Sequence, residues 1–289
     1  METKWNDTLK TGIITIAADE DFKTLIDEAI TVFEARHDYQ AVVFPVYTNE
    51  KEAIRLMIED SVRLAVVTRD LNNEEKKEME SRNMYTRKHL IAFDGVALIT
   101  HKMNPDSLIS ITTLKQILTG EITEWSQINP DTPLGAIRVL FEGKGSGVLR
   151  YVAESLIEGE KLSSNLYALN GNEEVVQRVI DMPNTIGLIG INFLEKNNSG
   201  AFSEKIRLMR VGKEDNISLE NTYLPYAGDI LQENYPLWRP VYALLSDPKS
   251  GLSSGFCIFL SQEIGQKIIL KSGLLPITDP HILPVRIIR

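Results

Sequence analysis

The first seventy residues alternate apolar runs with amphipathic segments, and this order constrains the fold more than any other feature of the chain. Short β-branched, apolar runs predict three buried strands, at 13–17, 41–47 and 64–68. Apolar residues at helical spacing predict two intervening helices, at 21–37 and 50–59. This strand–helix–strand–helix–strand order implies a parallel sheet covered by helices on both faces. Ligands of such sheets bind beyond the carboxyl ends of the strands, so the candidate loops are 17–22, 47–50 and 68–71.

The remainder of the chain predicts a second, independent α/β set. Further strands are predicted at 90–100, 137–141, 185–191, 240–245 and 274–278. Further helices are predicted at 112–118, 148–157, 173–181 and 254–271, with a highly charged, solvated helix within 70–87. Residues 197–231 mix turn residues and charge without strong periodicity.

Composition excludes several classes of protein. The 289 residues carry a formal net charge of −9, so nucleic acid and anionic membranes are not expected partners. The single cysteine, Cys257, excludes a disulfide framework and a cysteine-rich metal site, and the four histidines lack ligand spacing. We therefore expect no metal and no cofactor. No apolar run reaches 18 residues, and the polar start fits either a cytosolic protein or a chain whose export signal has been removed.

A glycine-rich turn, 142–147, lies between a predicted strand and a predicted helix. Its glycines allow backbone N–H groups to approach a ligand, the helix start offers unpaired donors, and Ser146 adds a hydroxyl. This pattern favours an anion-binding turn and a tight structural connection equally. It is neither a Walker P-loop nor a dinucleotide-binding fingerprint.

Two other segments could contribute to the same kind of site. Thr68 and Arg69 end a predicted parallel strand, where a guanidinium can bind an oxyanion through two hydrogen bonds. The alternative is that Arg69 pairs with Asp70 or another acid at the surface. Gly171 lies in a turn that precedes a predicted helix, and most such turns are only helix caps. No nucleophile–base set is recognisable, so we expect a protein without enzymatic activity.

Several segments together resemble the phosphate-binding proteins of ABC transporters. Residues 114–126 resemble that family's I-x-x-G-x-I-x-x-W segment, and Gly145-Ser146-Gly147 resembles its Gly-Ser-Gly-Thr turn. Residues 184–190 resemble its Ala-Ile-Gly-Tyr strand, residues 235–242 resemble its Tyr-Pro-x-x-Arg-Pro-Leu-Tyr segment, and Asp94-Gly95 also fits. The resemblance runs from about residue 12 to the end and is strongest to the version found in Bacteroidetes-type bacteria.

The resemblance implies a two-lobed α/β protein of the type II periplasmic-binding-protein fold. Each lobe would be a mixed, mainly parallel sheet flanked by helices, and two crossing strands would join the lobes. Lobe I would comprise residues 10–97 and 239–289, lobe II residues 98–238, and residues 1–9 would form a flexible N-terminal segment.

The resemblance also implies a set of ligand-binding residues, with departures from the family pattern. The expected positions are Asp21, Phe22, Thr68, Arg69, Ser146, Gly147, Arg150 and Gly171. Glu142 stands where the family has arginine, Val148 where it has threonine, and Asp21 where it has a hydroxyl. Thr68 stands where the family has a buried acid. Arg150 could replace the missing arginine and, with Arg69, bind one tetrahedral anion.

The function implied is extracytoplasmic capture of inorganic phosphate and its delivery to an ABC permease. The protein would be a monomeric periplasmic or cell-surface lipoprotein whose export signal is absent from this sequence. Acidic residues in the loops, Asp19, Asp21 and Glu142, favour one alternative if they point into the cleft, a receptor of the same fold for another oxyanion or a small organic acid. The other alternative is a sensor or scaffold that binds no solute.

Overall fold

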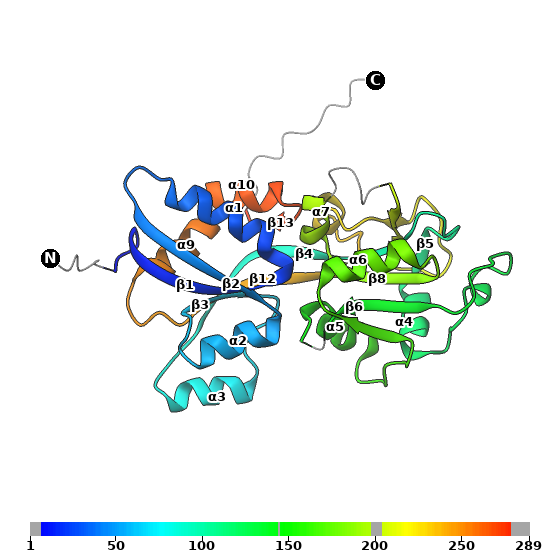
Figure 1. Cartoon of the computed structure of the whole chain (residues 1–289), viewed down its shortest axis with the longest axis horizontal. Coiled ribbons are helices and arrows are strands. Elements are labelled where there is room, and N and C mark those ends of the chain that lie inside the picture. The colour runs from blue at the N-terminus through cyan, green and yellow to red at the C-terminus, as the bar shows by residue number, and fades with distance from the viewer. Residues whose placement is uncertain (1–6, 144, 198–203, 279–289) are drawn as a thin grey trace, which may run out of the picture.

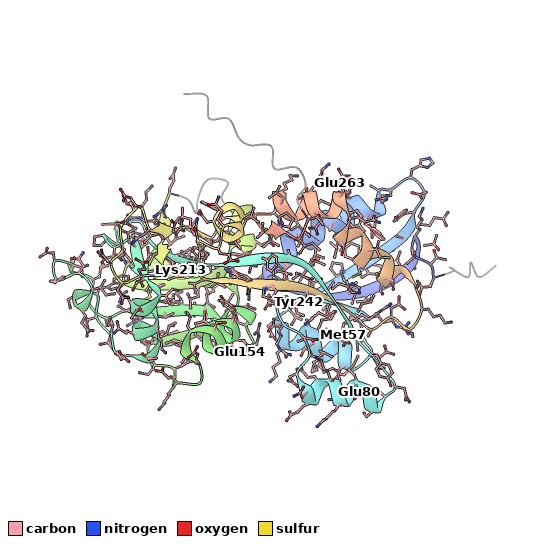
Figure 2. All side chains as sticks on the ribbon, turned by 180° about the vertical axis from the view of Figure 1, so that it is seen from behind. Met57, Glu80, Glu154, Lys213, Tyr242 and Glu263 are labelled. Carbon is pink, nitrogen blue, oxygen red and sulfur yellow. The ribbon has the colours of Figure 1, made fainter. Side chains whose placement is uncertain are left out.

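The structure is a computed structural model that describes residues 7–143, 145–197 and 204–278. It consists of two α/β halves that lie end to end along the long axis of the molecule (Figure 1). Two long strands, β4 (Arg87–His101) and β12 (Trp238–Leu245), connect the halves, and Tyr242 marks β12 in Figure 2.

The first half corresponds to the predicted lobe I and follows the predicted strand–helix order. It contains β1 (Thr11–Asp19), η1 (Glu20–Phe22), α1 (Lys23–Glu34), β2 (Gln40–Thr48), α2 (Glu50–Ile58), β3 (Leu64–Val67) and α3 (Asn73–Ser81). The chain returns to this half in α9 (Leu252–Ser261), α10 (Glu263–Lys271) and β13 (Leu275–Pro276).

The second half corresponds to the predicted lobe II. Its strands are β5 (Leu108–Ser110), β6 (Arg138–Glu142), β7 (Leu166–Leu169), β8 (Thr185–Gly190), β9 (Ile206–Leu208), β10 (Arg210–Gly212) and β11 (Thr222–Tyr223). Its helices are α4 (Ile111–Thr119), η2 (Trp125–Gln127), α5 (Gly147–Val152), η3 (Ala153–Ile157), α6 (Asn172–Asp181), α7 (Ile191–Asn197) and α8 (Ala227–Leu231).

One continuous path of hydrogen-bonded strands runs through both halves. The order is β2-β1-β3-β12-β4-β8-β6-β7, with β1 parallel to β2 and β3, and with β6 parallel to β7 and β8. The first part of β4 pairs with β12, and from Val96 onward β4 pairs with β8. The strand leaves one half and enters the other beside Gly95, where a Cβ would lie only 2.7 Å from Pro225. The carboxyl ends of β1, β3, β6 and β8 therefore meet between the halves.

The largest apolar core continues from the first half into the second. It combines Phe22, Leu25 and Phe33 near and within α1 with Val175 and Val179 of α6, all buried. Helices α1, α6, α7 and α10 lie together along the upper side of the molecule in Figure 1, whereas α2 and α5 lie below the strands. The halves are thus joined by an apolar core on one side of the sheet path.

The single helix predicted at 254–271 is wrong, because the chain forms two helices that meet at Gln262. That residue has an extended conformation (φ −88°, ψ 168°), which ends α9 and begins α10. The break folds α10 back so closely that a Cβ at Gly265 would lie 2.2 Å from the carbonyl oxygen of Phe259. The buried amide of Gln266 compensates by donating to the carbonyls of Leu260 (2.8 Å) and Ile91 (3.0 Å).

Other differences concern short elements. The charged segment 70–87 is helical only at α3, and the patterns did not predict β5, β7, β9, β10, β11, α7 or α8. Of the predicted flexible segment 1–9, residues 1–6 lie outside the described residues, as do residues 279–289 of the predicted lobe I. The exact lobe boundaries stay a prediction.

Candidate ligand-binding site

Polar side chains from both halves converge on the backbone of Gly147, at the start of α5. A Cβ placed on this glycine would lie 2.9 Å from Thr68 Oγ1, 3.0 Å from Arg239 Nη1 and 3.0 Å from Asp19 Oδ2. These three atoms come from the end of β3, the start of β12 and the end of β1. The absence of a side chain at Gly147 lets a helix start approach a guanidinium, a hydroxyl and a carboxyl group at once.

Arg239 is the centre of this arrangement and is completely buried. It lies directly opposite Asp94 in the β12–β4 ladder, and its Nε donates to Asp94 Oδ2 at 2.9 Å. Its Nη2 donates to Asp21 Oδ2 at 2.5 Å. Its Nη1 has no hydrogen-bond partner among the described residues. A buried guanidinium with one unused N–H group is a donor available to an anionic ligand.

The acids around Arg239 outnumber it. Asp19, Asp21 and Glu142 are all buried, and one carboxylate oxygen of each lies within 4.8 Å of the others. Asp19 Oδ1 accepts a hydrogen bond from the backbone N–H of Asp21, while Asp19 Oδ2 and Glu142 Oε2 have no partner in the described part of the chain. The halves therefore enclose unsatisfied acceptors beside one unsatisfied donor.

Burial and mutual repulsion perturb these carboxyl groups. Desolvation, with the neighbouring charge of Asp21, raises the pKa of Asp19 well above its ordinary value and raises the pKa of Glu142 to about 8. Desolvation also raises the pKa of Asp94 to about 6, although Arg239 opposes this shift. The site as it stands has too little positive charge for all its carboxylates.

Asn172, the first residue of α6, closes the site from the second half. Its Nδ2 donates to Asp21 Oδ1 at 2.6 Å, and this bond connects the two halves. The side chain is almost fully buried, and its Oδ1 has no partner among the residues described. Asn172 thus adds a third unsatisfied oxygen beside the carboxyl groups.

A second connection between the halves is a charged latch formed by Glu50, Thr68 and Arg150. Arg150 Nε donates to Glu50 Oε1 at 2.6 Å, and its Nη2 donates to Thr68 Oγ1 at 3.0 Å. Glu50 also accepts from the backbone N–H of Thr68 at 2.8 Å. Burial alone would raise the pKa of Glu50, but Arg150 and Thr68 outweigh it and lower that pKa. The latch is therefore present at neutral pH and is lost only as the pH falls through that lowered pKa.

Replacing Arg150 with methionine should favour separation of the halves. The latch is partly exposed on its Arg150 side (22%), so we expect the closed-to-open ratio of the ligand-free protein to fall by only about tenfold. Small-angle X-ray scattering should report a larger radius of gyration for Arg150→Met. The matched control is Arg178→Met, which removes an exposed arginine paired with Glu174 on α6. Equal radii for the two variants, at low and high salt, would contradict a latch.

The structure brings most of the residues expected from sequence to this site. Asp21, Thr68, Gly147 and Arg150 make the contacts described above. Ser146 caps α5, where its Oγ accepts from the backbone N–H of Leu149. The three remaining expected residues are Phe22, Arg69 and Gly171.

Among these three, Arg69 differs most from its expected role. Its guanidinium is bound by both carboxylate oxygens of Glu75, at 2.6 and 2.8 Å, which matches the ion-pair alternative for this residue. Phe22 is buried, with its ring 5.9 Å from the guanidinium carbon of Arg239. Gly171 has a φ of 116° and lies near Glu20. The roles of all eight residues in ligand binding stay a prediction.

Sequence reasoning missed the residues that organise the site. In the sequence, Arg239 and Asp94 belong only to family-like segments, Glu50 begins the predicted helix at 50–59, and Asn172 lies in the turn before the predicted helix at 173–181. The available signal was the pair of long apolar strands, because charged residues within such buried strands, Asp94 and Arg239, need partners. That signal shows a buried pair, and only the fold shows that the pair lies next to Gly147.

Among the described residues, no helix combines the length and apolarity required to cross a bilayer. Comparison with known proteins gives a consistent picture of the fold. A family model described as a PBP superfamily domain matches residues 5–263.

Curated relatives are remote but cover much of the chain. The phosphate-binding protein PstS of Staphylococcus saprophyticus is 25% identical over 212 residues, which is 73% of this chain and 63% of the relative. The chain thus matches less than two thirds of the length of that relative. The protein of the same name from Borreliella burgdorferi is 21% identical over 271 residues, covering 92% of this chain and 90% of the relative.

Solved structures show the same fold. A putative phosphate ABC transporter substrate-binding protein from Clostridium perfringens, solved with bound phosphate, superposes with a TM-score of 0.76 at 22% identity. The comparison covers 92% of this chain and 100% of that one. An ABC-type phosphate transport receptor from Vibrio cholerae gives a TM-score of 0.65 at 22% identity, with coverage of 92% and 100%. The mixed α/β architecture with two lobes is thereby confirmed.

Proposed function

Because the chain belongs to the family described as the PBP superfamily domain, we propose that it is an extracytoplasmic solute-binding protein that captures inorganic phosphate between its lobes. The bound phosphate would pass to the permease of an ABC transporter. The relatives named above support this proposal, since their names refer to phosphate binding or phosphate transport. The protein would bind phosphate between the two halves and would not catalyse a reaction.

The observation that carries the proposal is the unused Nη1 of Arg239 at the start of α5. It lies beside Thr68 Oγ1 and the backbone of Gly147, and Ser146 adds a hydroxyl at the helix cap. A guanidinium, hydroxyl groups and a glycine-rich turn are the groups that bind a tetrahedral oxyanion. Because these atoms come from both halves, a bound anion would hold the lobes closed, and it would enter when they separate.

The buried acids at the site favour one particular alternative to phosphate as the ligand. Each unit charge of phosphate placed about 4 Å from an ionised carboxylate costs about 4 kcal/mol at an effective dielectric constant of 20. Asp19 and Glu142 would therefore oppose a phosphate dianion if both stayed ionised. Their presence favours, as the second candidate, a same-fold receptor for a solute that brings its own hydrogen-bond donors or positive charge. The third candidate is a sensor or scaffold that binds no solute.

Thermal unfolding in the presence of candidate solutes tests the proposal. The protein is first unfolded and refolded to remove bound ligand, and then heated with phosphate, arsenate, sulfate or small organic acids at constant ionic strength. A ligand that binds only the folded state stabilises it by about 2.7 kcal/mol at one hundred times its Kd. We expect stabilisation by phosphate and arsenate and none by sulfate. Stabilisation by an organic acid alone would identify the second candidate, and no stabilisation by any solute would favour the third.

Several accompanying proposals concern the surroundings of the protein. Attachment as a lipoprotein at the cell surface or in the periplasm, a monomeric state and membership of a Bacteroidetes-type subgroup all stem from the family resemblance. The ligand contacts proposed are Asp21, Phe22, Thr68, Arg69, Ser146, Gly147, Arg150 and Gly171, to which the geometry adds Arg239.

A further inference from the structure

The buried carboxyl groups of Asp19, Asp21 and Glu142 form an oxygen cluster that the captured anion alone does not explain. We propose that this cluster, with Asn172, binds a divalent cation for which Ca²⁺ is the best match, and that the cation serves as a co-ligand for the anion. The cation site stands on its own geometry. The co-ligand role rests on the proposed function.

The carboxylate oxygens are close enough to share one ion. One oxygen from each acid lies within 4.8 Å of the other two. Ca²⁺ binds oxygen at about 2.3–2.6 Å in an adaptable geometry, so two of its ligands can be almost 5 Å apart. Mg²⁺ requires a near-ideal octahedron at about 2.0–2.1 Å and usually keeps several waters, which fits a buried cluster of protein oxygens less well. The cluster therefore suits Ca²⁺ better than Mg²⁺.

The cluster contains hydrogen-bond acceptors that have no partner and are closed to water. Asp19 Oδ2 and Glu142 Oε2 each expose less than 1 Å² and have no hydrogen-bond partner in the described ranges. A buried polar atom without a hydrogen-bond partner destabilises the folded protein, and a buried charge without a partner destabilises it more. A bare cation is smaller than a water molecule and binds oxygen at a shorter distance, so it satisfies both atoms with little added room.

Asn172 brings a further oxygen from the second half, and this oxygen is not a carboxylate. Asn172 is 1% exposed, and its amide nitrogen donates to Asp21, which holds the carboxamide against the cluster. Its Oδ1 is buried and has no partner among the residues described. Amide oxygens are ordinary Ca²⁺ ligands, and this donor set contains oxygen only, as hard divalent cations prefer. The sequence predicted no metal because it offers no histidine or cysteine spacing, and oxygen ligands from three separate segments leave no local motif.

Charge at the cluster is also unbalanced. Asp19, Asp21, Asp94 and Glu142 are buried around a single guanidinium, that of Arg239, so full ionisation would give a net charge of −3, which burial without a cation opposes by raising the pKa of Asp19 and of Glu142. The nearby Glu50–Arg150 pair is neutral and does not change this sum. A divalent cation reduces the charge to −1, whereas phosphate alone makes it more negative. When a cation and an anion bind together, the cation provides a partner for the unused carboxylate oxygens and the anion provides one for the unused Nη1 of Arg239.

Cation binding is tested first without any anion. The full chain is treated with EDTA, transferred to phosphate-free buffer and heated with CaCl₂, MgCl₂ or MnCl₂, with NaCl matching the ionic strength. We expect CaCl₂ to raise the melting temperature by about 5 °C at one hundred times its Kd. In Glu142→Gln, calorimetric titration should show at least about tenfold weaker Ca²⁺ binding. The control Glu160→Gln, an exposed acid paired with Lys115 in the same half, should behave like the wild type.

The co-ligand role is tested by titrating phosphate in EDTA and in Ca²⁺ below the concentration at which calcium phosphate forms. We expect at least about tenfold tighter phosphate binding by the wild type with Ca²⁺. Equal phosphate binding in EDTA and Ca²⁺, together with no effect of CaCl₂ alone, overturns the inference and leaves the proposed function intact. Binding of Ca²⁺ with no phosphate binding under any condition sinks the proposed function and the co-ligand role, and retains the cation site.

Discussion

Replacing Arg239 with methionine should lower the free energy of unfolding by about 3–5 kcal/mol, the largest loss we expect from any single side chain. The guanidinium is completely buried and contacts the equally buried carboxylates of Asp94 and Asp21. Removing it leaves both carboxylates without their cation in a region of low dielectric. Urea denaturation followed by circular dichroism measures the loss.

Two further variants make this result interpretable. Arg55→Met removes an exposed arginine that pairs with Glu52 and Glu59 on α2, and it should leave the denaturation midpoint unchanged within error. Adding Asp94→Asn to Arg239→Met should recover part of the lost stability, because it removes one of the uncompensated charges. A loss below about 1 kcal/mol in the single variant, or no recovery in the double one, would contradict the central role of this ion pair.

Replacing Gly147 with valine should reduce phosphate affinity by about a hundredfold or more while leaving the fold intact. A Cβ at this position would lie within 3.0 Å of Thr68, Arg239 and Asp19, and these atoms belong to the other half or to the connecting strand. The extra methyl groups would hold the halves apart, and the closed state that binds the anion would become rare. The glycine has no positive φ, so valine introduces no such strain in the open state.

The control lies in the same turn. A Cβ at Gly143 would make only an ordinary contact, 3.6 Å from the carbonyl oxygen of Leu169. We expect Gly143→Ala to bind phosphate like the wild type in the same calorimetric titration. Similar affinities for Gly147→Val and Gly143→Ala would show that the anion does not bind against the start of α5.

The sequence predicted the α/β class and most long elements because their signals are local. The β-branched runs of β1, β2 and β3 and the apolar faces of α1 and α2 need no knowledge of distant residues. The break at Gln262 could not be predicted this way, because the apolar stripe continues through it and the close approach of Gly265 to the Phe259 carbonyl is visible only in the fold. Strands of two or three residues, such as β11, have no period to detect.

The candidate site was predictable only in part, for a related reason. The loops after parallel strands pointed to 17–22 and 68–71, since the carboxyl ends of such strands meet. The family resemblance implied the positions Asp21 and Gly147. The partners of a side chain are set by tertiary packing, so the pairing of Arg69 with Glu75 could be stated only as an alternative. Arg239 and Asn172 reach the site from strands and helices far along the chain, and no local pattern indicates such a meeting.

The two sides of the molecule are joined by different kinds of interaction, and this asymmetry determines how it can open. Along α1 and α6 the halves share one apolar core, whereas α2 and α5 meet through the Glu50–Arg150 ion pair, with Glu154 nearby at the edge of the second half (Figure 2). Added salt weakens the charged contact and scarcely affects the apolar one. The apolar side should therefore act as a hinge, and the charged side as the edge that opens. Ionic strength would set how often this edge opens, and the apolar hinge would limit how far.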